Sequence, residues 1–239
     1  MQKTLDQKIA RILADSSCKD FMLADAKDAD MAFGIAAPGQ SPEYHGQEGK
    51  FRTLAEYREQ IRQVIRQAKV DIMLMSASTN EIITIEERLF DNSPVTPAAR
   101  ANDTSDVHVI TGGHYIDRPA LPFRSATIDH IQCGKYECSL QERKLGANLG
   151  LYSVTFNNHL ETDLNTLERF KEFRLEAEKK GFRYFLEVFN PNMPGVVEPE
   201  KLGRFINDHI VRSLAGVTKA GRPLFLKMVY QGPKAMEQL

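Results

Sequence analysis

The sequence holds little that would suit a secreted, membrane-embedded or nucleic-acid-binding protein. It has only three cysteines and no CxxC pair, so we expect no disulfide framework and place the protein in a reducing cytoplasm. The longest apolar runs, such as 224–226, are far too short to cross a bilayer, and charges interrupt the N-terminus too often for a signal peptide. The 31 basic and 32 acidic side chains leave a net charge of -1, which argues against a nucleic acid partner.

What is present is a series of short apolar runs that alternate with longer segments of helical periodicity. Such alternation is typical of βα units around a parallel sheet. The predicted strands are 21–24, 71–76, 95–101, 151–156, 183–189 and 223–229. The predicted helices are 3–17, 53–69, 81–90, 163–180, a segment that opens at Pro199 and ends by Gly221, and 233–239. The best marked helix is 53–69, where Thr53 and Glu56 have capping-box spacing ahead of an apolar stripe.

Two architectures have this pattern, a doubly wound sheet and a (β/α)8 TIM barrel. No glycine-rich fingerprint follows the first strand, where the chain reads DAKDAD, so a dinucleotide-binding doubly wound sheet is disfavoured. We therefore predict an α/β chain of the (β/α)8 TIM-barrel type, folded as a single domain over residues 1–239. A long insertion at about 102–150 would hold extended pieces at 107–111 and 126–133, and a loop at 38–49 would cover the barrel mouth.

The number of predicted strands is smaller than a complete barrel requires. A full barrel has eight strands and typically about 250 residues, whereas we find six strand–helix units. We expect that the sequence is truncated after strand six, because an unpaired edge at that strand would favour association. An incomplete or differently closed barrel is the alternative.

Polar side chains gather where the predicted strands end, which is where barrel enzymes carry their chemistry. The candidates for substrate binding are Lys27 and Asp28 after strand one, Ser76 after strand two, Arg100 and Asp103 around strand three, Asn157 and His159 after strand four, and Tyr230 after strand six.

Lys227 is the most informative residue because it stands inside LFLKMVY, a run otherwise suited to complete burial. A lysine there either extends toward solvent or sits in an apolar interior, where desolvation favours the neutral amine. A neutral amine is what forms a Schiff base with a carbonyl group. Glu187 stands in FLEVF on the preceding strand, so the two side chains lie within a few ångströms at the same height if these strands pair. A structural ion pair in a polar layer of the barrel is the alternative interpretation.

These positions form a pattern that resembles a known family. A lysine on strand six, a glutamate on strand five and an aspartate at the end of strand one resemble the class I, Schiff-base-forming aldolases, which include the deoxyribose-phosphate and tagatose-bisphosphate aldolase group. The stretches FMLADAKDADM, VTPAARANDTSD and FLEVFNPN are similar to those of an uncharacterised bacterial branch of that superfamily. The resemblance implies a barrel lyase that holds a carbonyl substrate as an imine or enamine on Lys227. It further implies that Glu187 moves protons and that Asp25 binds a hydroxyl group.

The chain departs from this family in two respects. Class I bisphosphate aldolases usually carry additional lysines on the middle strands, whereas strand four here ends at Asn157. The family's phosphate sites lie on loops after strands seven and eight, which the six predicted strands do not reach. The resemblance therefore gives no support for a phosphorylated substrate.

Other kinds of site are less well supported by the sequence. The acidic residues of DAKDAD are more typical of a solvated loop than of a metal site, and no HxxxH or HExxH spacing is present, so we predict no metal and no cofactor. Ser76 and Ser78 lack a GxSxG setting, which disfavours a serine hydrolase. Arg118 and Arg124 in the insertion are equally suited to clamping an anionic substrate and to an oligomer contact.

We therefore predict a cytoplasmic, homo-oligomeric aldehyde-lyase that acts on a small carbonyl substrate of sugar or sugar-phosphate type. Lys227, Glu187 and Asp25 are the expected catalytic residues. One alternative is a barrel isomerase or epimerase that uses the two carboxylates as acid and base, with Lys227 acting only through its charge. The other is a non-catalytic barrel that binds a ligand.

Overall fold

The computed structural model describes residues 1–42 and 50–239, and it divides into two compact units. Unit 1 consists of Met1–Arg100 and Asp129–Leu149, and unit 2 consists of Ala101–Ile128 and Gly150–Leu239. The predicted insertion at 102–150 is thus shared between the units. The predicted loop over the mouth, 38–49, lies largely outside the described residues.

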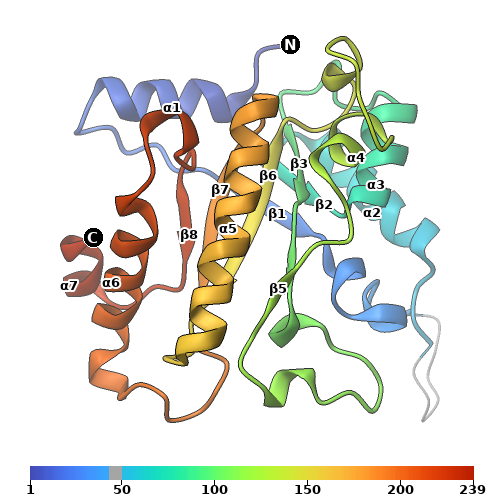
Figure 1. Cartoon of the computed structure of the whole chain (residues 1–239). Coiled ribbons are helices and arrows are strands. Elements are labelled where there is room, and N and C mark those ends of the chain that lie inside the picture. Colours follow the sequence, from blue (N-terminus) through green and yellow to red (C-terminus); the bar gives the residue numbers. More distant parts are fainter. Residues whose placement is uncertain (43–49) are drawn as a thin grey trace. The chain divides into compact units, whose positions relative to one another are not determined.

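Unit 1 is built on three parallel strands in the order β1-β2-β3 (Figure 1). The strands are β1 (Ala24–Lys27), β2 (Ile72–Met75) and β3 (Thr96–Arg100). The helices are α1 (Thr4–Ala14), α2 (Leu54–Gln67), α3 (Ala77–Asn80), a π-helical turn (Glu81–Glu86) and α4 (Ile128–Cys133), with 3-10 turns at Ala29–Met31, Gly34–Ala36 and Glu142–Lys144. The capping box that starts α2 is formed as predicted, since Thr53 Oγ1 accepts from the Glu56 amide and the Glu56 carboxylate accepts from the Thr53 amide.

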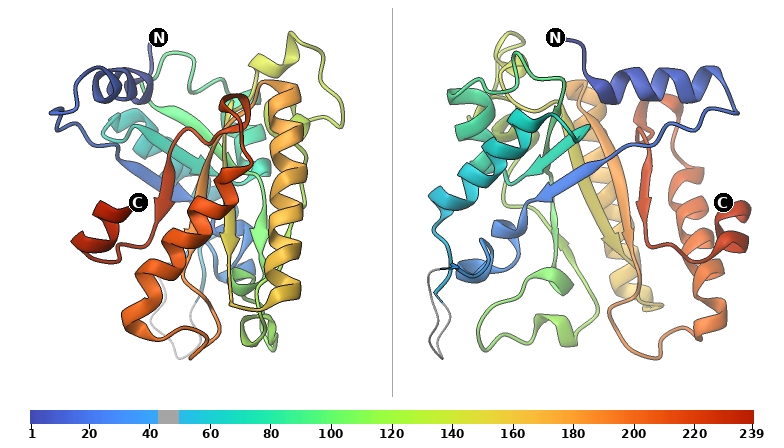
Figure 2. Two further views of the ribbon diagram at one scale, coloured as in Figure 1. Left: turned by 60° about the vertical axis from the view of Figure 1, so that its left-hand side comes forward. Right: turned by 180° about the vertical axis from the view of Figure 1, so that it is seen from behind.

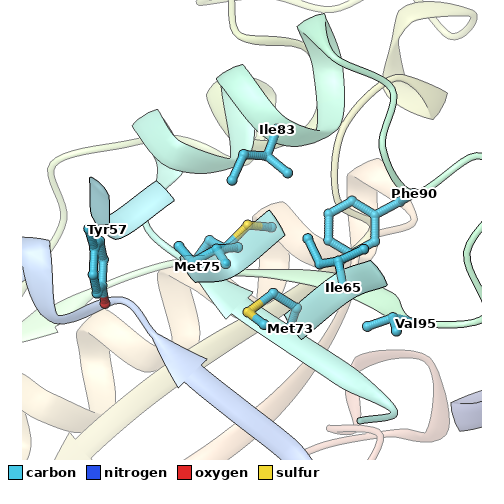
Figure 3. Close-up of a cluster of buried hydrophobic side chains, with 8 residues drawn as sticks. Tyr57, Ile65, Met73, Met75, Ile83, Phe90 and Val95 are labelled. Atoms are coloured by element: carbon cyan, nitrogen blue, oxygen red, sulfur yellow. The ribbon is translucent and has the colours of Figure 1, made fainter. Parts of the chain in front are cut away.

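The core of unit 1 lies between α2 and β2 (Figure 3). Met73 and Met75 are two residues apart on β2, so their side chains lie on the same face of the strand. Ile61 and Ile65 of α2 belong to the same cluster and are at most 2% exposed. Every residue of β2 is buried, so this strand is covered on both faces.

Unit 2 carries three strands in the order β6-β7-β8, and β7 and β8 pair in parallel. The strands are β6 (Leu149–Thr155), β7 (Arg183–Phe189) and β8 (Leu226–Met228), with a separate antiparallel pair of β4 (Asp103–Thr104) and β5 (Pro122–Phe123). The helices are α5 (Leu160–Lys180), α6 (Leu202–Ala215) and α7 (Pro233–Gln238), with 3-10 turns at Ser105–Val107, Tyr115–Asp117, Pro199–Lys201 and Lys219–Gly221. Figure 2 shows α5 and α6 running along these strands.

Four aromatic rings hold α5 against the strands of unit 2. Tyr152 of β6 stacks on Phe173 of α5 with 4.4 Å between ring centroids, and Tyr184 of β7 meets the same ring edge-on at 5.1 Å. Phe170, one helical turn earlier, contacts both tyrosines. The helix ends at Lys180, as predicted, and the Gly181 that follows has a φ of 62°, in the left-handed region that glycine adopts without strain.

The structure confirms the mixed α/β class of the chain, with parallel strands flanked by helices. The predicted strands at 71–76, 95–101, 151–156 and 183–189 and the helix at 53–69 are present within a few residues of their predicted bounds. The β1-β2-β3 and β6-β7-β8 sets amount to six strands in the described part of the chain, fewer than a closed barrel requires.

Three of the predicted elements are wrong in position or type. The first strand begins at Ala24, where it was expected to end, because Ala24 pairs with Ile72 while Phe21 is 72% exposed. Residues 128–133 form a helix instead of an extended piece, since Ile128 and Ile131 are both fully buried at helical spacing. The other extended piece, 107–111, contains the end of a 3-10 turn and no strand.

Candidate functional site

The strands of unit 2 have a helix-covered face and an opposite face. Tyr152 and Tyr184 contact Phe173 of α5, so they lie on the helix-covered face. Side chains alternate along a strand, and Ser153 and Glu187 therefore lie on the opposite face. A hydrogen bond of 2.8 Å from Ser153 Oγ to Glu187 Oε2 joins them there.

Lys227 and Glu187 form an ion pair on this face. The two residues are register partners in the β7–β8 pair, and Lys227 Nζ lies 2.5 Å from Glu187 Oε1. Glu187 is only 4% exposed, and each of its carboxylate oxygens has a donor, Lys227 for one and Ser153 for the other. The predicted juxtaposition of the lysine and the glutamate at one height is confirmed.

Of the two positions expected for Lys227, the one in an apolar interior is wrong, and the side chain extends toward solvent. Its side chain is 46% exposed, because β8 has only three residues and stands last in the strand order, with one strand beside it. The expected continuous burial of this strand is wrong for the same reason. The amine is therefore accessible to a small molecule, while its carboxylate partner is shielded.

An aromatic pair lies on the same face, one step nearer the start of the strands. Phe185 and Phe225 stand two residues before Glu187 and Lys227, respectively, and their rings stack with 4.8 Å between centroids. Apolar surface next to an amine and a carboxylate is typical of sites that bind small organic molecules.

Asn157, a predicted substrate ligand, instead supports the loop after β7. It is 1% exposed, its Nδ2 donates to Asn192 Oδ1 at 2.7 Å, and its Oδ1 accepts from the Met193 amide at 3.0 Å. Its carboxamide therefore fixes the loop that borders the carboxyl end of β6.

In unit 1 the predicted residues Asp28 and Arg100 are paired with each other. Their side chains are each 9% exposed, and the Arg100 guanidinium donates to Asp28 Oδ2. A buried ion pair of this kind holds β3 to the turn that follows β1. Asp25 and Lys27 both belong to β1, and 3.5 Å separates Lys27 Nζ from Asp25 Oδ1. Both side chains are partly exposed.

Asp30 is a residue of unit 1 that the sequence did not single out as a site residue. Its Oδ2 accepts hydrogen bonds from Ser76 Oγ at 2.5 Å and Thr79 Oγ1 at 3.3 Å, while its Oδ1 is buried with no partner. Burial raises the pKa of the Asp30 carboxyl, and the negative charge of Asp28 acts in the same direction. The Ser76 hydroxyl thus donates to the Asp30 carboxyl group and also caps α3.

The Asp30 carboxyl predicts a pH dependence of stability. Because its pKa in the folded protein is raised above 3.8, the folded chain binds this proton more tightly, and the free energy of unfolding falls as pH rises above about 4. Asp30→Asn stays neutral, so we expect it to gain stability relative to the wild type between about pH 4 and pH 7. Urea denaturation across this range measures the difference, with Asp208→Asn on the surface of α6 as control. A difference between Asp30→Asn and the wild type that does not change with pH contradicts the prediction.

The remaining predicted residues of unit 2 differ in their exposure. His159 is the exposed residue that precedes α5, where its Nδ1 lies 3.2 Å from Thr162 Oγ1. Tyr230 is 69% exposed after β8, and Asp103 is buried in β4.

Two residues of this face were missed although the sequence carried a signal for them. Ser153 and Thr155 stand at a spacing of two inside the apolar run LYSVTF, which marks one face of a strand as polar. Ser153 holds Glu187, and Thr155 Oγ1 donates to Asp106 Oδ2 at 3.0 Å.

The cysteine prediction is also wrong, because Cys133 and Cys138 form a disulfide. Cys133 ends α4, and the turn that follows brings the two Cα atoms within 6.0 Å, a distance that a disulfide can span. A CxxC search does not detect this spacing. The prediction of a reducing cytoplasm loses its support in the cysteine pattern.

Within residues 1–42 and 50–239, no group of three or more histidine, cysteine, aspartate and glutamate side chains is arranged to hold a metal ion. No helix in the described ranges is both long and apolar enough to span a membrane. Comparison with models of known protein families gives no match. A search of curated proteins finds no similar sequence either.

Proposed function

We propose that the chain is an enzyme that forms an imine between Lys227 and a carbonyl substrate, as class I aldolases do, on strands of barrel type. The observation that carries the proposal is the Lys227–Glu187 pair on the face away from α5, with an accessible amine 2.5 Å from a shielded carboxylate. An amine attacks a carbonyl carbon only when it is neutral, and Glu187 is positioned to take the proton from the ammonium.

The proposed reaction uses the same two side chains at each step. The Lys227 amine adds to the carbonyl carbon, and loss of water gives the imine, with Glu187 returning the proton to the departing oxygen. Removal of the proton from a β-hydroxyl group then cleaves the bond between the α and β carbons. This cleavage leaves an aldehyde and an enamine, which is protonated on carbon and hydrolysed. Ser153, which donates to the other carboxylate oxygen, keeps Glu187 oriented toward the amine.

We further propose a barrel class for the strands and a substrate-binding role for Asp25. The finer fold class is a (β/α)8 barrel, supported by the parallel strands and the helices along them. The role of Asp25 as a hydroxyl ligand is supported by its place in β1, where its carboxylate is partly exposed beside Lys27. Asp25 belongs to unit 1 and Lys227 to unit 2.

The second candidate is an isomerase or epimerase in which Glu187 moves a proton and Lys227 acts only as a positive charge. The short ion pair itself favours this reading, because a lysine that stays protonated beside a carboxylate stabilises negative charge without forming a bond. The two candidates differ in whether a covalent adduct forms.

Borohydride trapping distinguishes these functions. Incubation with hydroxy-aldehydes and hydroxy-ketones, followed by reduction and peptide mass mapping, should place a stable secondary amine on Lys227 and inactivate the enzyme. Lys227→Met should give no adduct at this position, whereas Lys201→Met, which removes an exposed lysine paired with Glu198, should behave like the wild type.

Two results would contradict the imine. An adduct yield that is unchanged in Lys227→Met would show that other lysines react. Turnover that persists after borohydride treatment would select the isomerase, in which Lys227 forms no bond to substrate.

A further inference from the structure

A cavity of about 630 Å³ lies in unit 2 beside the carboxyl end of β6. This volume is within the range of about 300–1,000 Å³ that is usual for small-molecule sites. Its apolar walls are formed by Val109, Ile116, Met193 and Pro194. Ligands of parallel α/β sheets bind at this end of the strands.

Asp106 supplies the cavity with a hydrogen-bond acceptor that is already held in place. Its Oδ2 accepts from Oγ1 of Thr155, the last residue of β6, at 3.0 Å. Its Oδ1 is buried and has no hydrogen-bond partner. A shielded carboxylate oxygen favours a ligand that brings a donor, such as a hydroxyl group.

The other polar side chains that line the cavity are engaged. Asn192 accepts from the Ala120 amide and from Asn157 Nδ2, and its own Nδ2 donates to the carbonyl oxygens of Ile116 and Arg118. A carboxamide has no further strong hydrogen bonds to offer once these four are made. The described residues that line the cavity include Asp106 and Asp117 but no lysine or arginine, so their charge opposes a phosphate or carboxylate group.

The cavity and the Lys227 amine lie along one face of the strands. Thr155, which holds Asp106, and Ser153, which holds Glu187, are two residues apart on β6 and point to the same side. Their separation along the strand is roughly 7 Å, which one short hydroxylated molecule can span.

We propose that this cavity receives the hydroxylated end of an unphosphorylated hydroxy-carbonyl substrate, with Asp106 Oδ1 accepting a hydrogen bond from a substrate hydroxyl. The proposal rests on the function proposed for Lys227, because that lysine defines where the carbonyl group lies. It adds the substrate class, and it assigns Asp106 as a substrate-binding residue.

Polyols test the cavity without the imine, since they have hydroxyl groups but no carbonyl. We expect glycerol, erythritol and xylitol to bind in NMR titrations, and to bind Lys227→Met as they bind the wild type. Glycerol 3-phosphate and erythritol 4-phosphate should bind at least about tenfold more weakly than the parent polyols. Asp106→Asn should weaken polyol binding about tenfold, because a neutral acceptor makes a weaker bond than a carboxylate, and it should reduce the discrimination against phosphate.

Asp208→Asn makes the same charge change on the surface of α6 and should leave both polyol and phosphate binding unchanged. Thermal unfolding of Asp106→Asn verifies that this variant is folded. The proposal is overturned if the wild type binds no polyol, if the phosphates bind as tightly as the polyols, or if Asp106→Asn binds polyols like the wild type. Failure of the imine chemistry is seen separately, as a missing borohydride adduct on Lys227 in a protein that still binds polyols.

Discussion

Glu187→Gln is expected to lower kcat for the carbonyl substrate by about 10²- to 10⁴-fold, the usual contribution of a positioned acid or base. Glutamine keeps the shape of the side chain and can still accept the hydrogen bond from Ser153, but it takes no proton from Lys227. Steady-state kinetics, with borohydride trapping on the same samples, separates loss of proton transfer from loss of the imine. A slower appearance of the Lys227 adduct with an unchanged final yield is the expected pattern.

The matched control removes a carboxylate that is away from the amine. Glu178 is an exposed residue of α5, and Glu178→Gln should keep the wild-type kcat. Glu187→Gln with wild-type kcat would eliminate the proposed acid–base role and leave Glu187 as a structural partner of Lys227.

Arg100→Met is expected to destabilise the protein by about 3–5 kcal/mol, because it leaves the Asp28 carboxylate buried without its cation. Urea denaturation of the full chain measures this loss as a lower midpoint. The double variant Asp28→Leu/Arg100→Met, in which both charges are replaced by apolar groups, should recover much of the stability. If the single and double variants are equally unstable, packing rather than the unpaired charge explains the loss.

Much of the fold was predictable where local signals and burial agree. The capping box at Thr53 marks the start of α2 and Gly181 marks the end of α5, because both signals depend on backbone geometry within a few residues. The strand at 183–189 was predicted without error, since an apolar run between two turns leaves few alternatives.

Elements whose position depends on distant residues were not predictable in the same way. The apolar run at 21–23 was expected to be a strand, but pairing of β1 with β2 begins only at Ala24. Hydrophobicity cannot give this register, because it is set by residues some 48 positions away, such as Asp71, whose Oδ2 accepts from the Leu23 amide.

The candidate site was predicted in composition but not in exposure. That Glu187 and Lys227 face each other follows from the period of two along neighbouring strands. Lys227 is exposed because β8 is short and stands at the end of the strand order. The residues around Lys227 in the sequence reveal neither of these two features. Asp106 lacks a local signal altogether, since its role depends on a hydrogen bond to Thr155, 49 residues away.

Neither unit can be produced as one uninterrupted stretch of the described chain. The chain leaves unit 1 after Arg100, re-enters it at Asp129 and leaves it again after Leu149. A single cleavage anywhere in the chain therefore gives at least one fragment that carries residues of both units. Unit 1 therefore depends on contacts between residues that are far apart in the sequence, such as the hydrogen bond from Asn80 Nδ2 to the Ile131 carbonyl oxygen, 51 residues away. Contacts of long sequence separation favour slow folding. Two fragments that are made separately should regain structure only when they are mixed.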